Sequence, residues 1–202
     1  MYKELIKRIA AELFRRKIPY MIIGGQAVLL YGEPRLTKDI EITLGVGVEK
    51  LPVLRAATKA LGLAIEADEV DTFVRETMVL PAKEPKSGIR VDFVFSFSPY
   101  ERQAIARAAK IMFDDIPVRF AALEDVVIHK IIAGRARDIE DIQTVLLKNP
   151  GYDSEYISSW LAEFDKGLEG KCLQVFKEIV GDLSRESAKR LRIAGRRRQS
   201  RS

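Results

Sequence analysis

The sequence contains little cysteine and little histidine. Its 202 residues include one of each, Cys172 and His129. A single cysteine excludes an internal disulfide, and the two residues together cannot supply the Cys/His cluster of a zinc site. Any metal that acts in this protein therefore needs oxygen ligands.

Long apolar runs are also missing. No stretch approaches the roughly 18 to 20 apolar residues that a membrane helix needs, and the N-terminus begins with an amphipathic pattern in place of a signal-peptide segment. We therefore expect a cytoplasmic protein without membrane contact. Its 47% hydrophobic residues are enough for the core of one domain, or of one domain with a helical appendage.

Acidic residues are absent from the last part of the chain. Residues 189–202, KRLRIAGRRRQSRS, hold seven Lys or Arg and no Asp or Glu, and without them the net charge falls from +5 to −2. This composition predicts a disordered basic tail. The tail is either a solvated terminus or an arm that binds phosphate backbones without sequence preference.

Hydrophobic periodicity predicts alternating helices and strands in the first part of the chain. The expected helices cover 2–16, 26–32, 48–62 and a segment that begins at Ser98, where Glu101 completes a capping box. The expected strands cover 20–23, 39–44, 73–80 and 89–95, followed by a hairpin, KIMF and IPVRF, across Asp114 and Asp115.

Everything after Leu123 has helical periodicity, in runs at 123–134, 137–148, 154–164 and 171–194. The fold class is therefore α/β (α+β), a small mixed sheet flanked by helices with an all-helical C-terminal part. The expected divisions are 1–122 for the α/β core, 123–188 for the helical part and 189–202 for the basic tail.

Two acids interrupt an otherwise apolar strand, DIEITL. Asp39 and Glu41 are two residues apart, so they face the same side with α-carbons roughly 6.5 to 7 Å apart. A third acid, Asp92 in RVDFVF, occupies another predicted strand. Three carboxylates on adjacent strands suit Mg²⁺ and two-metal phosphoryl transfer. The alternative is an ordinary solvated face of a half-buried sheet.

Two glycines end the apolar run IIGG, before the helix expected from Gln26. A turn without side chains, leading into a helix N-terminus, exposes backbone N–H groups to a polyphosphate. Gly24 and Gly25 therefore predict a phosphate cradle, although such a pair also suits a simple tight turn.

The order of these motifs resembles the nucleotidyltransferase superfamily of the DNA polymerase β type. IIGG is followed after thirteen residues by DIEI, and RVDFVF supplies the later acid. The segment 129–146, HKIIAGRARDIEDIQTVL, resembles a helical pair of the minimal, stand-alone branch, which includes abortive-infection toxins and antibiotic nucleotidyltransferases. The resemblance covers about residues 15 to 148 and implies the nucleotidyltransferase fold.

The resemblance also implies a reaction, the transfer of a nucleoside monophosphate from an NTP to an acceptor hydroxyl with release of pyrophosphate. Asp39, Glu41 and Asp92 would be the catalytic residues and the ligands of Mg²⁺ or Mn²⁺, and Asp92 would help to deprotonate the acceptor. Arg35 and Thr37 would contact a phosphate or fix their loop. The implied nucleotide-binding residues are Gly24, Gly25, Arg35, Thr37 and Lys130.

Several functions remain open on the sequence alone. The acceptor is RNA, including tRNA, a protein or a small molecule, and a toxin of this kind would have an antitoxin partner. Glu41 stands where the superfamily more commonly has Asp, which keeps a non-catalytic relative that binds a nucleotide or RNA as the alternative. The sequence motifs do not specify the acceptor, the preferred base or the oligomeric state.

The segment around Lys130 also allows structural roles. Apolar neighbours on the helix predict that His129 and Lys130 lie at its surface. Asp138 is placed to cap the following helix, and Asp141 is placed for a surface ion pair four residues after Arg137.

Overall fold

The structure, a computed structural model, describes residues 1–34, 37–96, 98–167 and 170–199, with side chains through Arg185. Its contacts divide the chain into two compact units, Met1–Val126 and Val127–Ser202. Each unit is described by itself.

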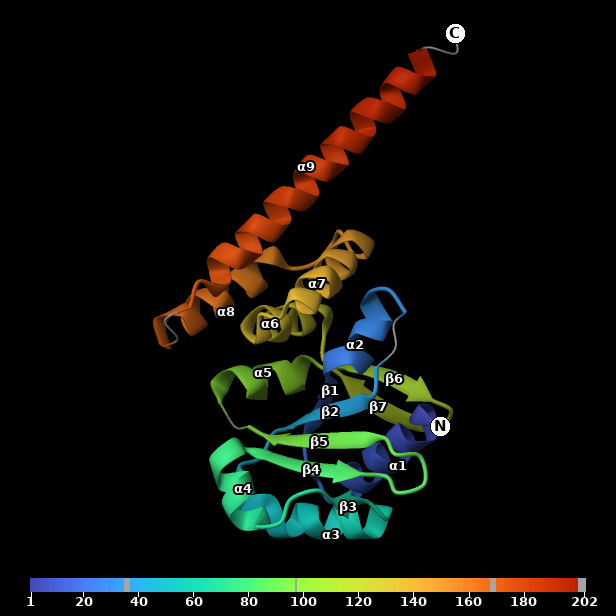
Figure 1. Cartoon of the computed structure of the whole chain (residues 1–202), viewed down its shortest axis with the longest axis vertical. Helices are drawn as coiled ribbons and strands as arrows, with labels where there is room; N and C mark the ends of the chain where they lie inside the picture. Colours follow the sequence, from blue (N-terminus) through green and yellow to red (C-terminus); the bar gives the residue numbers. More distant parts are fainter. Residues whose placement is uncertain (35–36, 97, 168–169, 200–202) are drawn as a thin grey trace. The chain divides into compact units, whose positions relative to one another are not determined.

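The first unit is built on a mixed sheet. Seven strands in the described residues follow the order β3-β4-β5-β2-β1-β7-β6 (Figure 1). β1 pairs antiparallel with β2, whereas β2–β5 and β1–β7 are parallel, which confirms the predicted mixed sheet. The strands are β1 (Tyr20–Ile23), β2 (Asp39–Leu44), β3 (Ala64–Ile65), β4 (Val79–Lys83), β5 (Arg90–Phe95), β6 (Ala109–Phe113) and β7 (Ile116–Phe120).

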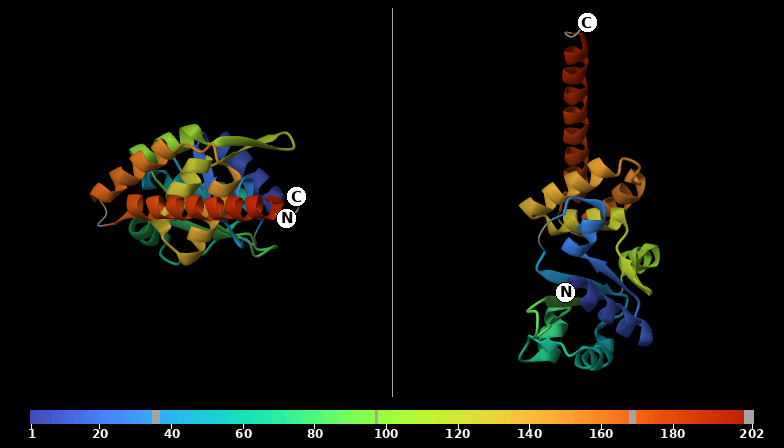
Figure 2. Two further views of the ribbon diagram at one scale, coloured as in Figure 1. Left: turned by 90° about the horizontal axis from the view of Figure 1, so that it is seen from above. Right: turned by 90° about the vertical axis from the view of Figure 1, so that its right-hand side faces the viewer.

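Most helices occur where the hydrophobic pattern predicts them, and α4 is the exception. Those of the first unit are α1 (Tyr2–Arg15), α2 (Gly24–Tyr31), the 3-10 turn η1 (Val48–Lys50), α3 (Leu51–Leu61), α4 (Val70–Thr77) and α5 (Pro99–Arg107). α6 (Leu123–Ala133) begins in the first unit and continues into the second, which also contains α7 (Ala136–Lys148), α8 (Ser154–Gly167) and α9 (Cys172–Gln199). Figure 2 shows these helices from two further directions.

Buried apolar residues and half-buried acids alternate along β2 and β5. Ile40 and Ile42 of β2 are fully buried, while Asp39 and Glu41 on the other face are half-buried. β5 repeats the pattern, with Val91 and Phe93 buried on the face opposite Asp92. One face of this strand pair therefore belongs to the core, and the other carries the acids.

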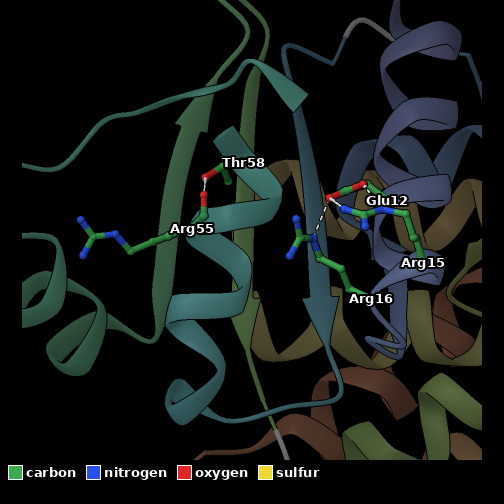
Figure 3. A network of polar contacts seen from close by, with 5 residues as sticks. All are labelled: Glu12, Arg15, Arg16, Arg55 and Thr58. Atoms are coloured by element: carbon green, nitrogen blue, oxygen red, sulfur yellow. Dashed lines mark hydrogen bonds and ion pairs between the residues drawn. The ribbon is translucent and has the colours of Figure 1, made fainter. Parts of the chain in front are cut away.

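The C-terminal end of α1 is held by a local ion network. Arg15 Nε and Arg16 Nε donate hydrogen bonds of 2.9 and 2.6 Å to the carboxylate of Glu12, as Figure 3 shows. These hydrogen bonds, with that of Arg15 first, lower the pKa of Glu12 to about 2. In α3, the Thr58 hydroxyl donates to the Arg55 carbonyl, 2.9 Å away.

Two predicted boundaries are wrong. The strand expected over 73–80 is helix α4 up to Thr77, and β4 begins only at Val79 after Met78 adopts a left-handed φ of +60°. Only Val74 of α4 is buried, so its β-branched and aromatic residues belong to a surface helix. α2 begins at Gly24 itself, so the two glycines are its first residues and not a separate turn.

The long helix α9 has a helical backbone through Gln199. It therefore overlaps the basic segment 189–202, whose disorder in solution stays a prediction. Among the described residues, no helix is both long enough and apolar enough to cross a membrane.

Candidate functional site

The three predicted acids share one face of the β2–β5 pair. In this parallel pair Asp39 lies opposite Arg90, and Glu41 lies opposite Asp92. Residues directly opposite each other point to the same side of a sheet, as do residues two apart in a strand. Asp39, Glu41 and Asp92 therefore form one half-buried acidic group on adjacent strands, as the sequence predicts.

The carboxylates of this group do not gather at one point. Within the described part of the chain, no set of three or more His, Cys, Asp or Glu side chains is close enough to hold a metal ion. Glu41 and Asp92 instead lie toward different neighbours, Gly24 and Arg90 respectively. Because like charges repel at short range, carboxylates without a shared counterion are expected to separate in this way.

Glu41 extends toward the start of α2. A Cβ built on Gly24 would lie 1.6 Å from Glu41 Oε2, so the carboxylate occupies the space that a side chain at position 24 would need. Gly24 also has φ +64°, a conformation that only glycine adopts without strain. The N-cap residue of α2, Ile23, is apolar and cannot cap the helix, so an anion is favoured at this end.

Asp92 extends toward Arg90, two residues earlier in β5. Arg90 Nη2 lies 3.7 Å from Asp92 Oδ1, and Arg90 Nε lies 3.9 Å from Glu66 Oε2. Burial raises the pKa of Asp92, Arg90 opposes this rise, and the nearby charges of Asp39 and Glu66 add to it. The dependence on Asp39 shows that the two aspartates interact across the strands.

Two further predicted nucleotide ligands, Arg35 and Thr37, precede β2 in the sequence. The Thr37 hydroxyl donates a 3.0 Å hydrogen bond to the carbonyl of Asp39, which ties the loop to the first residue of the strand. This contact matches the loop-fixing alternative for Thr37. Arg35 lies outside the described residues.

The second unit contains Lys130, the remaining predicted ligand. Its Nζ lies 2.7 Å from Asp138 Oδ1 and 2.7 Å from Asp141 Oδ2. All three residues are buried. Asp138 also accepts the Arg135 backbone N–H at 3.2 Å through Oδ2, so its predicted capping role is confirmed. Asp141 meets Lys130 across the α6–α7 connection, a contact that the Arg137 spacing did not suggest.

The surface position that helical spacing predicts is wrong for Lys130, while His129 is half-buried. Lys130 is only 5% exposed, and burial lowers the pKa of His129 to about 4. The helical pattern failed here because α6 has buried residues on most of its circumference, with Val126, Val127, Ile128 and Ile131 all in the core. The sequence did contain an indication that Lys130 is buried, because Asp138 and Asp141 follow in the next helix and can pair with it.

Arg90 and Glu66 are polar residues of this face that the sequence reasoning missed. For Arg90 the signal was present, since the alternation that places Asp92 on the acidic face places a residue two positions earlier there as well. Glu66 follows a strand of only two residues, β3, which carries no detectable alternation.

The donor chemistry of the acidic face fits a hard divalent cation. Asp39, Glu41 and Asp92 supply carboxylate oxygens only, the ligands that Mg²⁺ prefers. They are half-buried on neighbouring strands, and Glu41 and Asp92 are direct register neighbours. A common ion requires these two side chains to change conformation, away from Gly24 and Arg90 respectively.

Comparison with known proteins identifies relatives of this fold. The family model "Nucleotidyl transferase AbiEii toxin, Type IV TA system" matches residues 13–201. No curated protein matches the sequence. The solved structure of the antibiotic-resistance factor ANT(2'')-Ia is similar with a TM-score of 0.56 at 17% identity, covering 93% of this chain and 97% of that protein.

Two further solved structures have the same fold. A nucleotidyltransferase-like antigen from Paracoccidioides brasiliensis has a TM-score of 0.54 at 16% identity, over 86% of this chain and 92% of its own. JHP933 from Helicobacter pylori has a TM-score of 0.52 at 14% identity, over 95% of both chains. At these identities the likeness establishes the fold, which confirms the predicted nucleotidyltransferase class.

Proposed function

Because the chain belongs to the AbiEii family of nucleotidyl transferase toxins, we propose that it transfers a nucleoside monophosphate from an NTP to an acceptor hydroxyl. The observation that carries this proposal is the common face of Asp39, Glu41 and Asp92, next to the glycine-initiated N-terminus of α2. An acidic face beside a helix N-terminus suits a substrate that combines a polyphosphate with metal ions.

In the proposed reaction, the acceptor oxygen attacks the α-phosphorus of the NTP, and the bond to the bridging oxygen of the β-phosphate breaks. Pyrophosphate leaves, and the hydroxyl proton passes to Asp92. Burial raises the pKa of this carboxyl, which brings it closer to the operating pH of a general base. Asp39 and Glu41, with Asp92, would hold Mg²⁺ or Mn²⁺, which when bound neutralises charge on the triphosphate.

The phosphates are proposed to bind at the start of α2. Gly24 and Gly25 contribute backbone N–H groups of the first turn, and close approach of a phosphate to Gly24 requires the Glu41 carboxylate to move out of the space beside it. Lys130 and Arg35 complete the proposal as phosphate contacts. An ammonium group has three donors, so Lys130 keeps one beside its two carboxylate partners.

The acceptor is proposed to be tRNA or another RNA, with a protein or a small molecule as alternatives. The solved structure of ANT(2'')-Ia in complex with adenylyl-2''-tobramycin supports the small-molecule alternative. The family model describes toxins of type IV toxin–antitoxin systems, which supports an antitoxin partner and action in the cytoplasm.

The test combines each α-labelled NTP with Mg²⁺ or Mn²⁺ and total cellular RNA or a cell extract. We expect label transfer that falls about 10²- to 10⁴-fold in Asp92→Asn, the range for loss of a general base, and at least as far in Asp39→Asn. Asp71→Asn removes a carboxylate of an exposed ion pair with Arg55 in the same unit and serves as the matched control. Transfer that is unchanged in both acidic-face variants would refute the proposal.

The rival function is a non-catalytic protein that binds a nucleotide or RNA on the same scaffold. Glu41 favours it, because its carboxylate lies against Gly24, and the described side chains of Asp39, Glu41 and Asp92 do not form a metal-binding group. This rival predicts nucleotide binding, measured by calorimetry, without label transfer to any acceptor. Deletion of residues 189–202 tests the tail separately, since an electrostatic arm loses RNA affinity steeply as salt rises.

A further inference from the structure

Arg90 lies between two carboxylates on the acidic face. Its Nη2 is 3.7 Å from Asp92 and its Nε is 3.9 Å from Glu66, so the guanidinium is shared and neither contact is a close bidentate pair. The side chain is 56% exposed, which leaves it free to move between the two. The cation next to Asp92 is therefore held by loose contacts on both sides.

Glu66 has a fixed place on this face. Its backbone N–H donates to the carbonyl of Pro81, 2.9 Å away, and Pro81 is the register partner of Asp92 on β4. Its carboxylate is also 3.4 Å from Lys83 Nζ, and Lys83 is the register partner of Arg90. Glu66 thus follows β3, two strands from Asp92 in β5, on the side away from Glu41.

A guanidinium beside Asp92 competes with any cation for the same carboxylate. A divalent ion that binds Asp92 is repelled by Arg90 until the guanidinium moves away, and Glu66 is the nearest described carboxylate that can receive it. The charge of Arg90 would then be balanced at Glu66 while Asp92 is used by the incoming cation.

We infer that Arg90 and Glu66 are positioning residues of the site, with Arg90 as the internal counterion of Asp92 and Glu66 as the group that receives Arg90 when a divalent cation binds. The inference rests on the proposed function, because it assumes that Asp39, Glu41 and Asp92 hold the cation. The inference gives a role to Arg90 and Glu66, which the sequence reasoning did not identify. It also explains why Asp92 is turned toward Arg90.

The experiment measures Mn²⁺ binding to the full chain by electron paramagnetic resonance of the free ion, without nucleotide or acceptor. Glu66→Gln leaves Asp92 as the remaining partner of Arg90 and should weaken Mn²⁺ binding. Arg90→Gln removes the competing cation and should strengthen it. Each change is expected to be about two- to fivefold, the range of a part-exposed ion pair. Asp71→Asn is the control and should have no effect.

The double variant Glu66→Gln/Arg90→Gln tests whether Glu66 acts by receiving Arg90 or only by attracting the divalent cation through its own negative charge. If Glu66 acts by receiving Arg90, Glu66→Gln has no effect on Mn²⁺ affinity in the Arg90→Gln background. An equal weakening in both backgrounds means that Glu66 acts only through its negative charge, and this overturns the inference while leaving the proposed function intact. A wild-type protein whose Mn²⁺ binding is absent, or is unchanged in Asp39→Asn, overturns the proposed cation site and the inference together.

Discussion

Lys130 provides the sharpest stability test because its charge is buried between two acids. The side chains of Lys130, Asp138 and Asp141 are only 7%, 10% and 8% exposed. At an effective dielectric constant of 20, each 2.7 Å contact corresponds to an attraction of about 6 kcal/mol before desolvation. Lys130→Met keeps the shape of the side chain but leaves both carboxylates without this cation. We expect a loss of about 3 to 5 kcal/mol in the free energy of unfolding.

Urea unfolding followed by tryptophan fluorescence measures this loss directly. The chain has one tryptophan, Trp160 in α8, which lies in the same unit as Lys130. Lys166→Met is the matched control, because Lys166 forms only an exposed ion pair with Glu163 in that helix and its loss should matter little.

A second variant tests the electrostatic cause. Adding Asp141→Asn to Lys130→Met removes one of the two buried carboxylates that lost this cation, so the double variant should be more stable than Lys130→Met alone. The reasoning is refuted if Lys130→Met lies within about 1 kcal/mol of wild type, or if the Asp141 change adds a further loss.

Three other predictions concern stability. Gly24→Ala should cost about 1 to 2 kcal/mol, because position 24 has φ +64° and the new methyl group meets Glu41; equal melting in calorimetry would contradict this. The pKa of Glu12 is about 2 when folded against 4.5 ordinarily, so it contributes stability that is lost as the pH falls from 4.5 toward 2. Glu12→Gln should flatten that part of the acid-unfolding curve, and superimposable curves would count against it. The pKa of His129 is about 4 against 6.5, so the unfolded chain takes up its proton first and stability declines as the pH falls from 6.5 toward 4. His129→Phe should remove this decline from the Trp160 unfolding signal, and a decline that persists would assign it to other groups.

The sequence was most informative where one face of a strand is buried. DIEITL and RVDFVF place apolar and polar residues on opposite faces, so period-two alternation predicted which side chains of β2 and β5 share the acidic face. Ser98 likewise predicted the start of α5, and its hydroxyl accepts the Glu101 N–H at 3.3 Å. These predictions depend only on local geometry.

Predictions failed where tertiary contacts decide the outcome. The α4 segment has residues typical of a strand, yet Thr77 donates its hydroxyl to the Phe73 carbonyl within a helix that buries only Val74. The apolar neighbours of Lys130 on α6 predicted a surface position, but its ion pairs with Asp138 and Asp141 of the next helix bury it. Neither outcome follows from periodicity, since both depend on which neighbour packs against the segment.

The arrangement of the acidic face follows from charge and side-chain length together. Register brings Glu41 and Asp92 side by side, where two carboxylates repel, and each finds a different positive neighbour. Asp92 reaches the guanidinium of Arg90, while the extra methylene of Glu41 lets it reach the helix end at Gly24. An aspartate at position 41 is one methylene shorter and would remain closer to Asp92. If the acidic face holds a divalent cation as proposed, Glu41 must leave the space beside Gly24 to reach it.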